Sequence, residues 1–244
     1  MKSIVRILVA CTALLASGSA FAEQYPSKPV KIIIPFPAGG VTDIAGRLIA
    51  QRLSERLGQQ FYIENIGGAG GNLGMAQVAR APADGYTVLL SSSSVSVNPS
   101  LYANMPFDPE KDLAPVTKAG GSPNSWLVHP NFPAKNMKEF VELIRKDPGK
   151  YSVGSPGAGT TPSLSIEQLK HDLKLNFVTV PFAGGGPMTQ SLLGGHVPVV
   201  CGAIGNSVAL IKDGKIRALG ITDKKRLETP VSYTHLTLPT IYSV

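Results

Sequence analysis

Apolar strands alternate with amphipathic helices along most of this 244-residue chain, and glycine-rich turns join them. Residues 30–35 form a mostly apolar run, as expected for a strand that is buried on both faces. A turn at residues 37–40 leads into a helical stretch that ends at the C′ glycine Gly58. A strand at 60–64, a glycine-rich loop at 67–71, a short helix up to Arg80 and a strand at 87–91 follow. This alternation predicts a mostly parallel, right-handed α/β sheet.

The first helix has a predicted inward face and a predicted outward face. Its apolar residues recur at near-helical spacing, and its charged residues fall between them. We therefore expect one set of residues to face the sheet and another to face solvent. The inward set is Ile44, Ala45, Leu48, Ile49, Leu53 and Leu57, and the outward set is Arg47, Arg52, Glu55 and Arg56.

The same pattern starts again near residue 122. Strands are predicted at 126–129, 151–154, 177–181, 197–201 and 216–222, and helices near 162–171, 187–193 and 206–212. Another helix is predicted where Met137, Phe140, Val141 and Ile144 are spaced as one helix face. The restart indicates two α/β lobes, at residues 23–120 and 121–222.

Three glycine-rich turns, at residues 36–43, 154–161 and 181–187, each follow an apolar strand and open a helix. Such a turn directs unpaired backbone N–H groups toward the carboxyl edge of the sheet, where the helix dipole favours an anion. Thr42, Ser155, Thr160 and Thr161 add hydroxyl groups. Any single turn of this kind is also explained by the glycine that tight connections need. Three of them together predict a shared anion-binding cleft.

The sequence lacks the common motifs of catalysis and metal binding. It contains no G-x-x-x-x-G-K-[ST], G-x-G-x-x-G, G-x-S-x-G, H-E-x-x-H or C-x-x-C. We interpret His129, His171 and His196 as structural or solvated, and we expect no catalytic residue, no metal and no cofactor. Residues 91–94 are four serines, which we interpret as a group of hydrogen-bonding hydroxyls. Asp43 either caps its helix or takes part in ligand recognition.

The N-terminus has the features of an export signal. Lys2 and Arg6 precede an apolar run at residues 7–16, and Ala20, Phe21 and Ala22 form a small-x-small cleavage site. The run is too short to span a bilayer, so we expect cleavage after Ala22, a periplasmic mature protein and no stable membrane insertion. Cleavage lowers the formal charge from +7 to +5, because it leaves 21 basic and 16 acidic residues. Without a basic block, we expect no nucleic-acid binding.

The last fourteen residues differ in composition from the rest of the chain. Residues 231–244 contain no Lys, Arg, Asp or Glu, and residues 231–240 (VSYTHLTLPT) resemble a translated sequencing adaptor. We interpret residues 231–244 as a non-native tail, and a natural threonine-rich strand is the alternative. On this interpretation, the native C-terminal sequence is missing.

Several longer segments together carry a resemblance to a family. They are YPSKPVKIIIPFPAGGVTDIAGRLIAQRLSERLGQQFYIENIGGAGGNLG from Tyr25, then ADGYTVLLSSSS, VNPSLY, YSVGSPGAGTTP, VPFAGGGPMTQSLLGG and IRALGIT. In this order they resemble the Bug-type receptors, which are the periplasmic solute-binding proteins of tripartite tricarboxylate transporters. The resemblance covers residues 25 to about 230 and implies an α/β, two-lobed, type II-like periplasmic-binding-protein (Venus flytrap) fold. It also implies that residues 223–230 begin a return to the first lobe, which would be incomplete here.

The resemblance also implies a ligand site. Members of the family hold a small carboxylate through backbone amides, hydroxyl groups and water, from one loop of each lobe. Ser163, Phe182, Pro198 and Gly202 depart from the residues common in relatives, which leaves the contacts farther from the anion in doubt. Carried over to this chain, the ligand-binding residues are Phe36, Ala38, Gly39, Gly40, Thr42, Asp43, Ser92, Ser93, Ser155, Gly157, Gly159, Thr160, Thr161, Phe182, Ala183, Gly184 and Gly185.

The expected function is that of a non-catalytic receptor, which captures a mono-, di- or tricarboxylate and delivers it to a membrane permease. Two alternatives remain. One is an exported α/β hydrolase or transferase, which needs a base and a nucleophile in the cleft. The other is a sensor subunit that presents its ligand-bound lobes to a signalling partner. Backbone donors recognise carboxylates in general, so the ligand itself is not identified. We also expect reduced stability and weak closure if the first lobe is incomplete.

Overall fold

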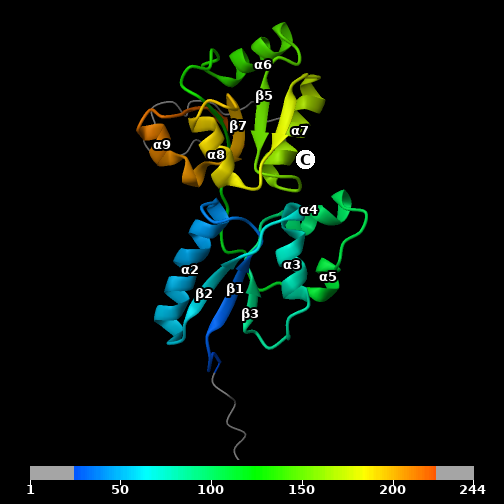
Figure 1. Ribbon diagram of the computed structural model, residues 1–244, viewed down its shortest axis with the longest axis vertical. Coiled ribbons are helices and arrows are strands. Elements are labelled where there is room, and N and C mark those ends of the chain that lie inside the picture. The colour runs from blue at the N-terminus through cyan, green and yellow to red at the C-terminus, as the bar shows by residue number, and fades with distance from the viewer. Residues whose placement is uncertain (1–24, 224–244) are drawn as a thin grey trace, which may run out of the picture.

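A computed structural model describes residues 25–223 of the chain. The predicted signal peptide with its cleavage site, residues 224–230 and the predicted tail at residues 231–244 lie outside the described residues. Within the described part, no helix is long and apolar enough to cross a lipid bilayer. The elements form two groups, one above the other in Figure 1, and each group contains its own β-sheet.

The lower group in Figure 1, which we call the first lobe, contains a three-stranded parallel sheet with the order β2-β1-β3. Its strands are β1 (Val30–Ile34), β2 (Phe61–Asn65) and β3 (Thr87–Leu89). Helix α2 (Val41–Leu57) packs against β1 and β2, and helix α3 (Asn72–Ala79) packs against β1 and β3. The 3-10 helix η1 (Ala69–Gly71) and the helices α4 (Ser94–Leu101) and α5 (Pro109–Asp112) complete the lobe. The sequence pattern did not predict α4 or α5.

The predicted inward face of α2 is wrong for most of its residues, although Leu53 does pack against the core of the first lobe. Ile44, Leu48 and Leu57 are 52%, 59% and 44% exposed, and Ala45 is exposed as well. The buried residues of the helix are instead Asp43, Gly46 and Ala50. Small residues face the sheet because the helix lies very close to it. A Cβ atom at Gly46 would lie 2.6 Å from Ile34 Cδ1 and 2.9 Å from Leu90 Cδ2, so a large side chain has no room on that face.

The upper group, which we call the second lobe, contains a five-stranded sheet with the order β6-β5-β7-β4-β8. Its strands are β4 (Asn124–Val128), β5 (Ser152–Ser155), β6 (Val178–Pro181), β7 (Val199–Ala203) and β8 (Arg217–Ile221), close to the predicted ranges. The sheet is mixed, because β4 runs antiparallel to both β7 and β8 while β5 is parallel to β6 and β7. Its helices are α6 (Met137–Lys146), α7 (Thr161–Leu173), α8 (Gly185–Leu193), the 3-10 helix η2 (Ile204–Asn206) and α9 (Val208–Lys212).

Alternate residues of the second sheet build two apolar cores, one on each face. Trp126 and Val128 of β4 belong to the core that includes Phe140 of α6, whereas Leu127 belongs to the core that includes Met188 of α8. This period of two is the geometry of a strand whose side chains point to opposite faces. The first lobe has separate cores of its own, one of them built on the central strand β1.

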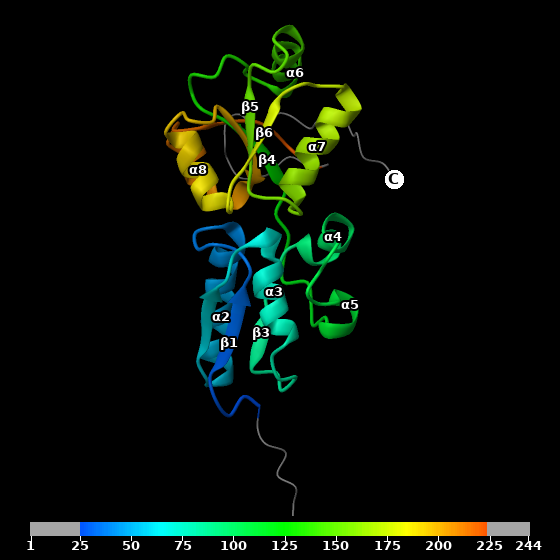
Figure 2. The same cartoon turned by 45° about the vertical axis from the view of Figure 1, so that its right-hand side comes forward.

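The strand directions place the carboxyl ends of the parallel strands at the boundary between the lobes. The arrowheads of β1 and β2 point toward the second lobe, and the arrowhead of β5 points toward the first (Figures 1 and 2). The loops that follow these strands therefore meet at the boundary, as expected for the ligand-binding edge of parallel α/β sheets.

Candidate functional site

Short distances show which loops of the two lobes meet. A Cβ atom at Gly184 would lie 3.0 Å from Pro37 Cδ, and one at Gly186 would lie 3.4 Å from the carbonyl oxygen of Ala38. Within the second lobe, a Cβ atom at Gly157 would lie 3.2 Å from the carbonyl oxygen of Phe182. All three predicted glycine-rich turns are thus adjacent to one another. We call residues 36–43, 91–94, 155–161 and 182–187 the boundary loops.

The first boundary loop is held in place by the Asp43 carboxylate. Its Oδ2 accepts a hydrogen bond from the Gly39 amide at 3.0 Å and one from Arg47 Nε at 3.0 Å. Its Oδ1 accepts from Arg47 Nη2 and from Asn65 Nδ2, each at 3.0 Å. Asn65 Nδ2 also donates to the carbonyl oxygen of Phe36. Asp43 therefore ties the start of α2, the loop and the end of β2 together, and its oxygens are not free to bind a ligand.

These contacts also set the ionisation of Asp43. Burial on its own raises the pKa of this carboxyl group, because a charged group loses its hydration. The hydrogen bonds from Arg47, Gly39 and Asn65 outweigh burial, so the pKa lies below its ordinary value. Arg47 and Asp43 form an (i, i+4) ion pair on α2. The Asp43–Arg47 ion pair, which has no net charge, therefore stiffens the loop, and neither residue is left as an unpaired charge.

The N-terminus of α2 offers amide donors at the same place. Gly40 is the N-cap residue and has no side chain that could satisfy the first turn. Within the described residues, no protein acceptor takes the N–H of Gly40, Val41 or Thr42. The Gly39 amide, which sequence reasoning had grouped with them, donates to Asp43 instead. The donors that can face a ligand here are thus the ones that follow Gly39.

The hydroxyl groups of the second boundary loop mostly build the loop itself. Thr160 Oγ1 donates to the carbonyl oxygen of Gly157 at 2.7 Å and accepts from the Ser163 amide, as an N-cap does. Thr161 Oγ1 donates to Asn124 Oδ1 at 3.2 Å, and Ser155 Oγ accepts from the Gly157 amide. In the part of the chain that the structure covers, the amides of residues 159–161 have no protein acceptor.

The third boundary loop has the same character. The Phe182 amide donates to the carbonyl oxygen of Ser155, which joins this loop to the second one. Helix α8 begins after Gly184, which has a φ of 135° and no side-chain cap. Between residues 25 and 223, no protein group accepts a hydrogen bond from the amides of Ala183, Gly184 or Gly185. Three helix N-termini with free amides therefore converge on one boundary.

The serine group after β3 also carries unused hydrogen-bonding capacity. Ser92 Oγ lies 3.1 Å from Ser94 Oγ, so these two hydroxyls pair with each other. The Oγ atoms of Ser91 and Ser93 are buried and have no partner in the described residues. Ser93 is the N-cap residue of α4. A third buried polar atom without such a partner, Asn98 Oδ1, follows on α4, and sequence reasoning had not singled it out.

The titratable groups of the described residues do not form a catalytic or metal-binding set. No group of three or more His, Cys, Asp or Glu residues could hold a metal ion there. His129 Nδ1 accepts from the Asn131 amide, and His171 pairs with the adjacent Asp172. Cys201 is fully buried, and burial raises the pKa of its thiol, which makes it a poor nucleophile.

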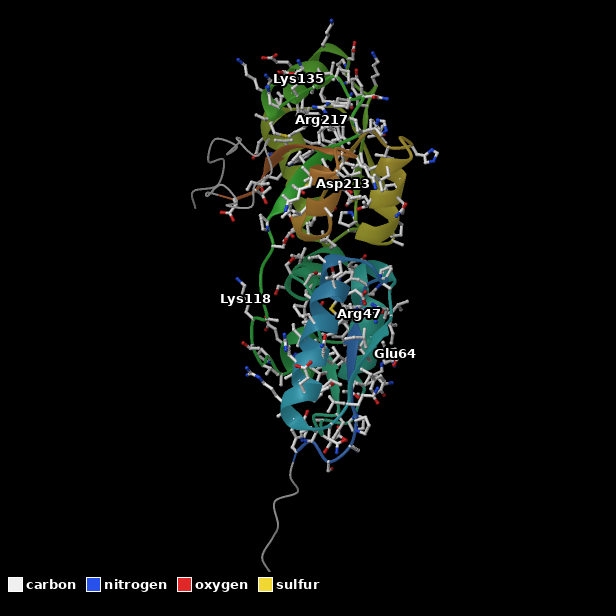
Figure 3. All side chains as sticks on the ribbon, turned by 90° about the vertical axis from the view of Figure 1, so that its left-hand side faces the viewer. Arg47, Glu64, Lys118, Lys135, Asp213 and Arg217 are labelled. Carbon is white, nitrogen blue, oxygen red and sulfur yellow. The ribbon has the colours of Figure 1, made fainter. Side chains whose placement is uncertain are left out.

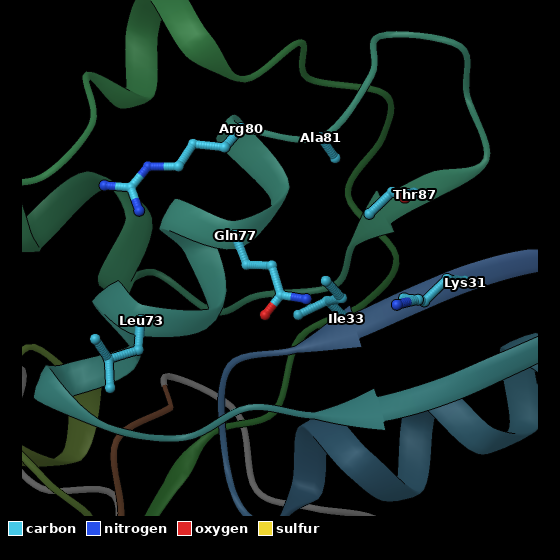
Figure 4. A pocket seen from close by; sticks show the side chains of 7 residues that line it. All are labelled: Lys31, Ile33, Leu73, Gln77, Arg80, Ala81 and Thr87. Atoms are coloured by element: carbon cyan, nitrogen blue, oxygen red, sulfur yellow. The ribbon is translucent and has the colours of Figure 1, made fainter.

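The hollow drawn in Figure 4 lies away from the boundary loops. It has a volume of about 510 Å³ and lies over β1, α3 and β3 of the first lobe. Among its lining residues, Lys31 is paired with Glu64 at 2.7 Å, and Leu73 is 56% exposed. None of the predicted ligand-binding residues lines it; its residues are Lys31, Ile33, Leu73, Gln77, Arg80, Ala81 and Thr87.

A family comparison identifies related sequences. Residues 45–234 match the family described as "Tripartite tricarboxylate transporter family receptor". A UPF0065 protein of Bordetella pertussis is 37% identical over 228 residues, which cover 92% of this chain and 70% of that protein. Protein BugT of the same organism is 34% identical over 233 residues, which cover 93% of this chain and 69% of BugT.

Solved structures show the same architecture. A structure described as a periplasmic transporter has a TM-score of 0.83 and 40% identity, and the match covers 86% of this chain and 71% of that one. Rpa4515 of R. palustris, solved with adipate, has a TM-score of 0.83 and 33% identity over the same shares of the two chains. MatC of Rhodopseudomonas palustris, with bound malate, has a TM-score of 0.75 and 32% identity, covering 83% of this chain and 69% of MatC.

Proposed function

Because this chain belongs to the receptor family of the tripartite tricarboxylate transporters, we propose that it binds a small carboxylate at the boundary loops. The family consists of solute-binding receptors rather than enzymes, which removes the hydrolase or transferase alternative. The solved relatives with adipate and malate bind dicarboxylates, and we extend that ligand class to this chain. The observation that carries the proposal is the convergence of three helix N-termini whose amides have no acceptor in the described residues.

In the proposed complex, the amides of Gly40, Val41, Thr42, Thr160, Thr161, Gly184 and Gly185 face the carboxylate, together with the hydroxyls of Ser92 and Ser93. Hydrogen bonds between backbone N–H groups and a carboxylate are charge-assisted and therefore strong. Asp43, Gly39 and Phe36 support the first loop, and Ser155, Gly157 and Gly159 shape the second. Ala38, Phe182 and Ala183 complete the walls of the proposed ligand site. The boundary loops contain no Lys or Arg, so the anion is held by dipoles.

The proposal includes a cellular setting. Relatives are periplasmic, and we propose that an export signal cleaved after Ala22 brings this chain to the periplasm, where it delivers its ligand to permease subunits of the transporter. We also propose lobes at residues 23–120 and 121–222, with residues 223–230 beginning a return to the first lobe.

Removal of a single amide tests the ligand site directly. Val41 is the first residue of α2, and Gly40 before it has a φ of −78° and a ψ of 165°, which suit the residue before a proline, so Val41→Pro deletes one N–H group without disturbing the turn. Val41→Ala is the matched control, because it also shortens this side chain but keeps the N–H group. By titration calorimetry with malate and adipate, we expect Val41→Pro to bind roughly 10 to 100 times more weakly than Val41→Ala. Equal affinities of the two variants would contradict the site, and no binding of either acid by the wild type would contradict the ligand class.

A further inference from the structure

Asn98 presents a buried oxygen atom to the contact between the lobes. The residue lies on α4 of the first lobe and is 0% exposed. Its Nδ2 donates to the carbonyl oxygen of Gly70 at 3.0 Å and to Asn72 Oδ1 at 2.6 Å. A backbone carbonyl can only accept a hydrogen bond, so the nitrogen of the amide must face Gly70. Asn98 Oδ1 therefore points away from Gly70, and no described residue donates to it.

Asn98 Oδ1 lies against Gly159, which belongs to the second lobe. Gly159, in the second boundary loop, has a φ of 77°, and a Cβ atom there would lie only 2.0 Å from Asn98 Oδ1. Beside it, the carbonyl oxygen of Ala158 lies 3.0 Å from the position of a Cβ at Gly70. The tip of the second boundary loop is thus inserted against η1 and α4 of the first lobe. A side chain of any kind at residue 159 would push this tip away.

We propose that Asn98 and Gly159 form the closure contact of the receptor, and that Asn98 is a positioning residue for the second boundary loop. A buried oxygen without a partner is unfavourable, and the loop has amides at residues 159–161 that no described residue accepts. When the lobes close on a ligand, the Gly159 amide, which is not among those assigned to the carboxylate, donates to Asn98 Oδ1. This bond favours the closed state because it is made only there. The inference rests on the proposed function, since the ligand drives closure.

The steric part of the proposal, that a side chain at residue 159 forces the lobes apart, is tested without any ligand. Spin labels at Arg52→Cys on α2 and Lys138→Cys on α6, both exposed sites, report the distance between the lobes by pulsed electron resonance. Cys201 is fully buried, and Cys11 is removed with the proposed signal peptide, so neither thiol competes for the label. We expect Gly159→Ala to lengthen this distance, because the added Cβ cannot occupy the position of Asn98 Oδ1.

Two companion variants make this result specific. Asn98→Ala should restore the shorter distance in the Gly159→Ala background, because the added Cβ then meets nothing closer than Leu101 Cδ1, at an ordinary 3.6 Å. Gly214→Ala has a similar φ of 69° and nothing within 4 Å, so it should leave the distance unchanged. An unchanged distance in Gly159→Ala, or no recovery in the double variant, overturns the proposal.

The hydrogen-bonding half is tested with malate and adipate as probes. We expect Asn98→Ala to weaken binding about tenfold, with the change in the dissociation rate rather than the association rate, because closure follows the first encounter. If Asn98→Ala leaves the affinity unchanged, or weakens it only through slower association, the proposed role of Asn98 Oδ1 is overturned. If the wild type binds neither acid, the proposed ligand class fails, whereas the distance measurements still decide the closure contact.

Discussion

Asp43 shows how a buried charge can hold a loop in place through hydrogen bonds from three elements. Its carboxylate is surrounded by donors from α2, the first boundary loop and β2, so the loop geometry depends on a single side chain. The sequence predicted that Asp43 lies at the start of its helix, but it did not decide between a capping role and a role in ligand recognition. Asn65 could not be assigned from the sequence, because it meets Asp43 only once the register of β2 beside β1 is fixed, whereas Arg47 is the (i, i+4) partner of Asp43 on α2, a spacing that the sequence does contain.

Replacement of this carboxylate should destabilise the protein in a pH-dependent way. The lowered pKa means that the folded state favours the ionised form, so its stabilising effect is present above about pH 4 and is lost as the pH falls through the lowered pKa. We expect Asp43→Asn to cost about 1–3 kcal/mol at pH 7 and less at pH 3, in urea unfolding of the variant and the wild type. Asp213→Asn, on an exposed ion pair with Lys215, is the control and should have little effect at either pH. A constant difference across this pH range would contradict the assignment.

Helix α2 shows where pattern reasoning succeeds and where it fails at the level of an element. Its bounds follow from the turn before it and from Gly58, whose left-handed conformation ends it. Its buried face does not follow, because the apolar pattern gives no weight to a glycine that lets a helix approach a sheet closely. Strands such as β1 and β7 were predicted better, because their continuous apolar runs are buried on both faces.

The corrected face of α2 gives a second prediction. We expect Gly46→Ala to lower the free energy of unfolding by about 1–3 kcal/mol, even though alanine is the better helix former, because its Cβ would overlap Ile34 and Leu90. Leu48→Gln should change stability by less than about 0.5 kcal/mol, since the side chain is exposed. Urea unfolding midpoints of the two variants measure this difference. A larger loss in Leu48→Gln than in Gly46→Ala would support the original, inward assignment of Leu48.

On the scale of the whole molecule, the lobes are two bodies with separate cores and an exposed connection. The cores of the first lobe share no residue with those of the second. The described connection runs through residues 114–122, which are all exposed, and Lys118 extends from its outer side (Figure 3). The restart of the strand–helix pattern near residue 122 made this division visible in the sequence. The contact between Asn98 and Gly159 was not visible, because it depends on how the lobes face each other.

Limited proteolysis checks this organisation. Within residues 25–223, we expect trypsin to cut first after Lys118, because extended, exposed backbone is the preferred substrate, and to release two fragments that each retain one sheet. Lys118→Gln should slow the appearance of these fragments. If that variant yields the same fragments at the same rate, the connection is protected and the lobes are joined more firmly than their separate cores indicate.

The absence of Lys and Arg from the boundary loops has a consequence for how ionic strength affects the receptor. Dissolved ions screen the attraction between separated charges, whereas hydrogen bonds at short range to amide dipoles are affected far less. A receptor of this kind gains little from long-range steering of its ligand, but its affinity changes little between dilute and salty surroundings. If the ligand binds at the glycine-rich turns as proposed, recognition there provides tolerance of variable salt, at the expense of the fastest capture.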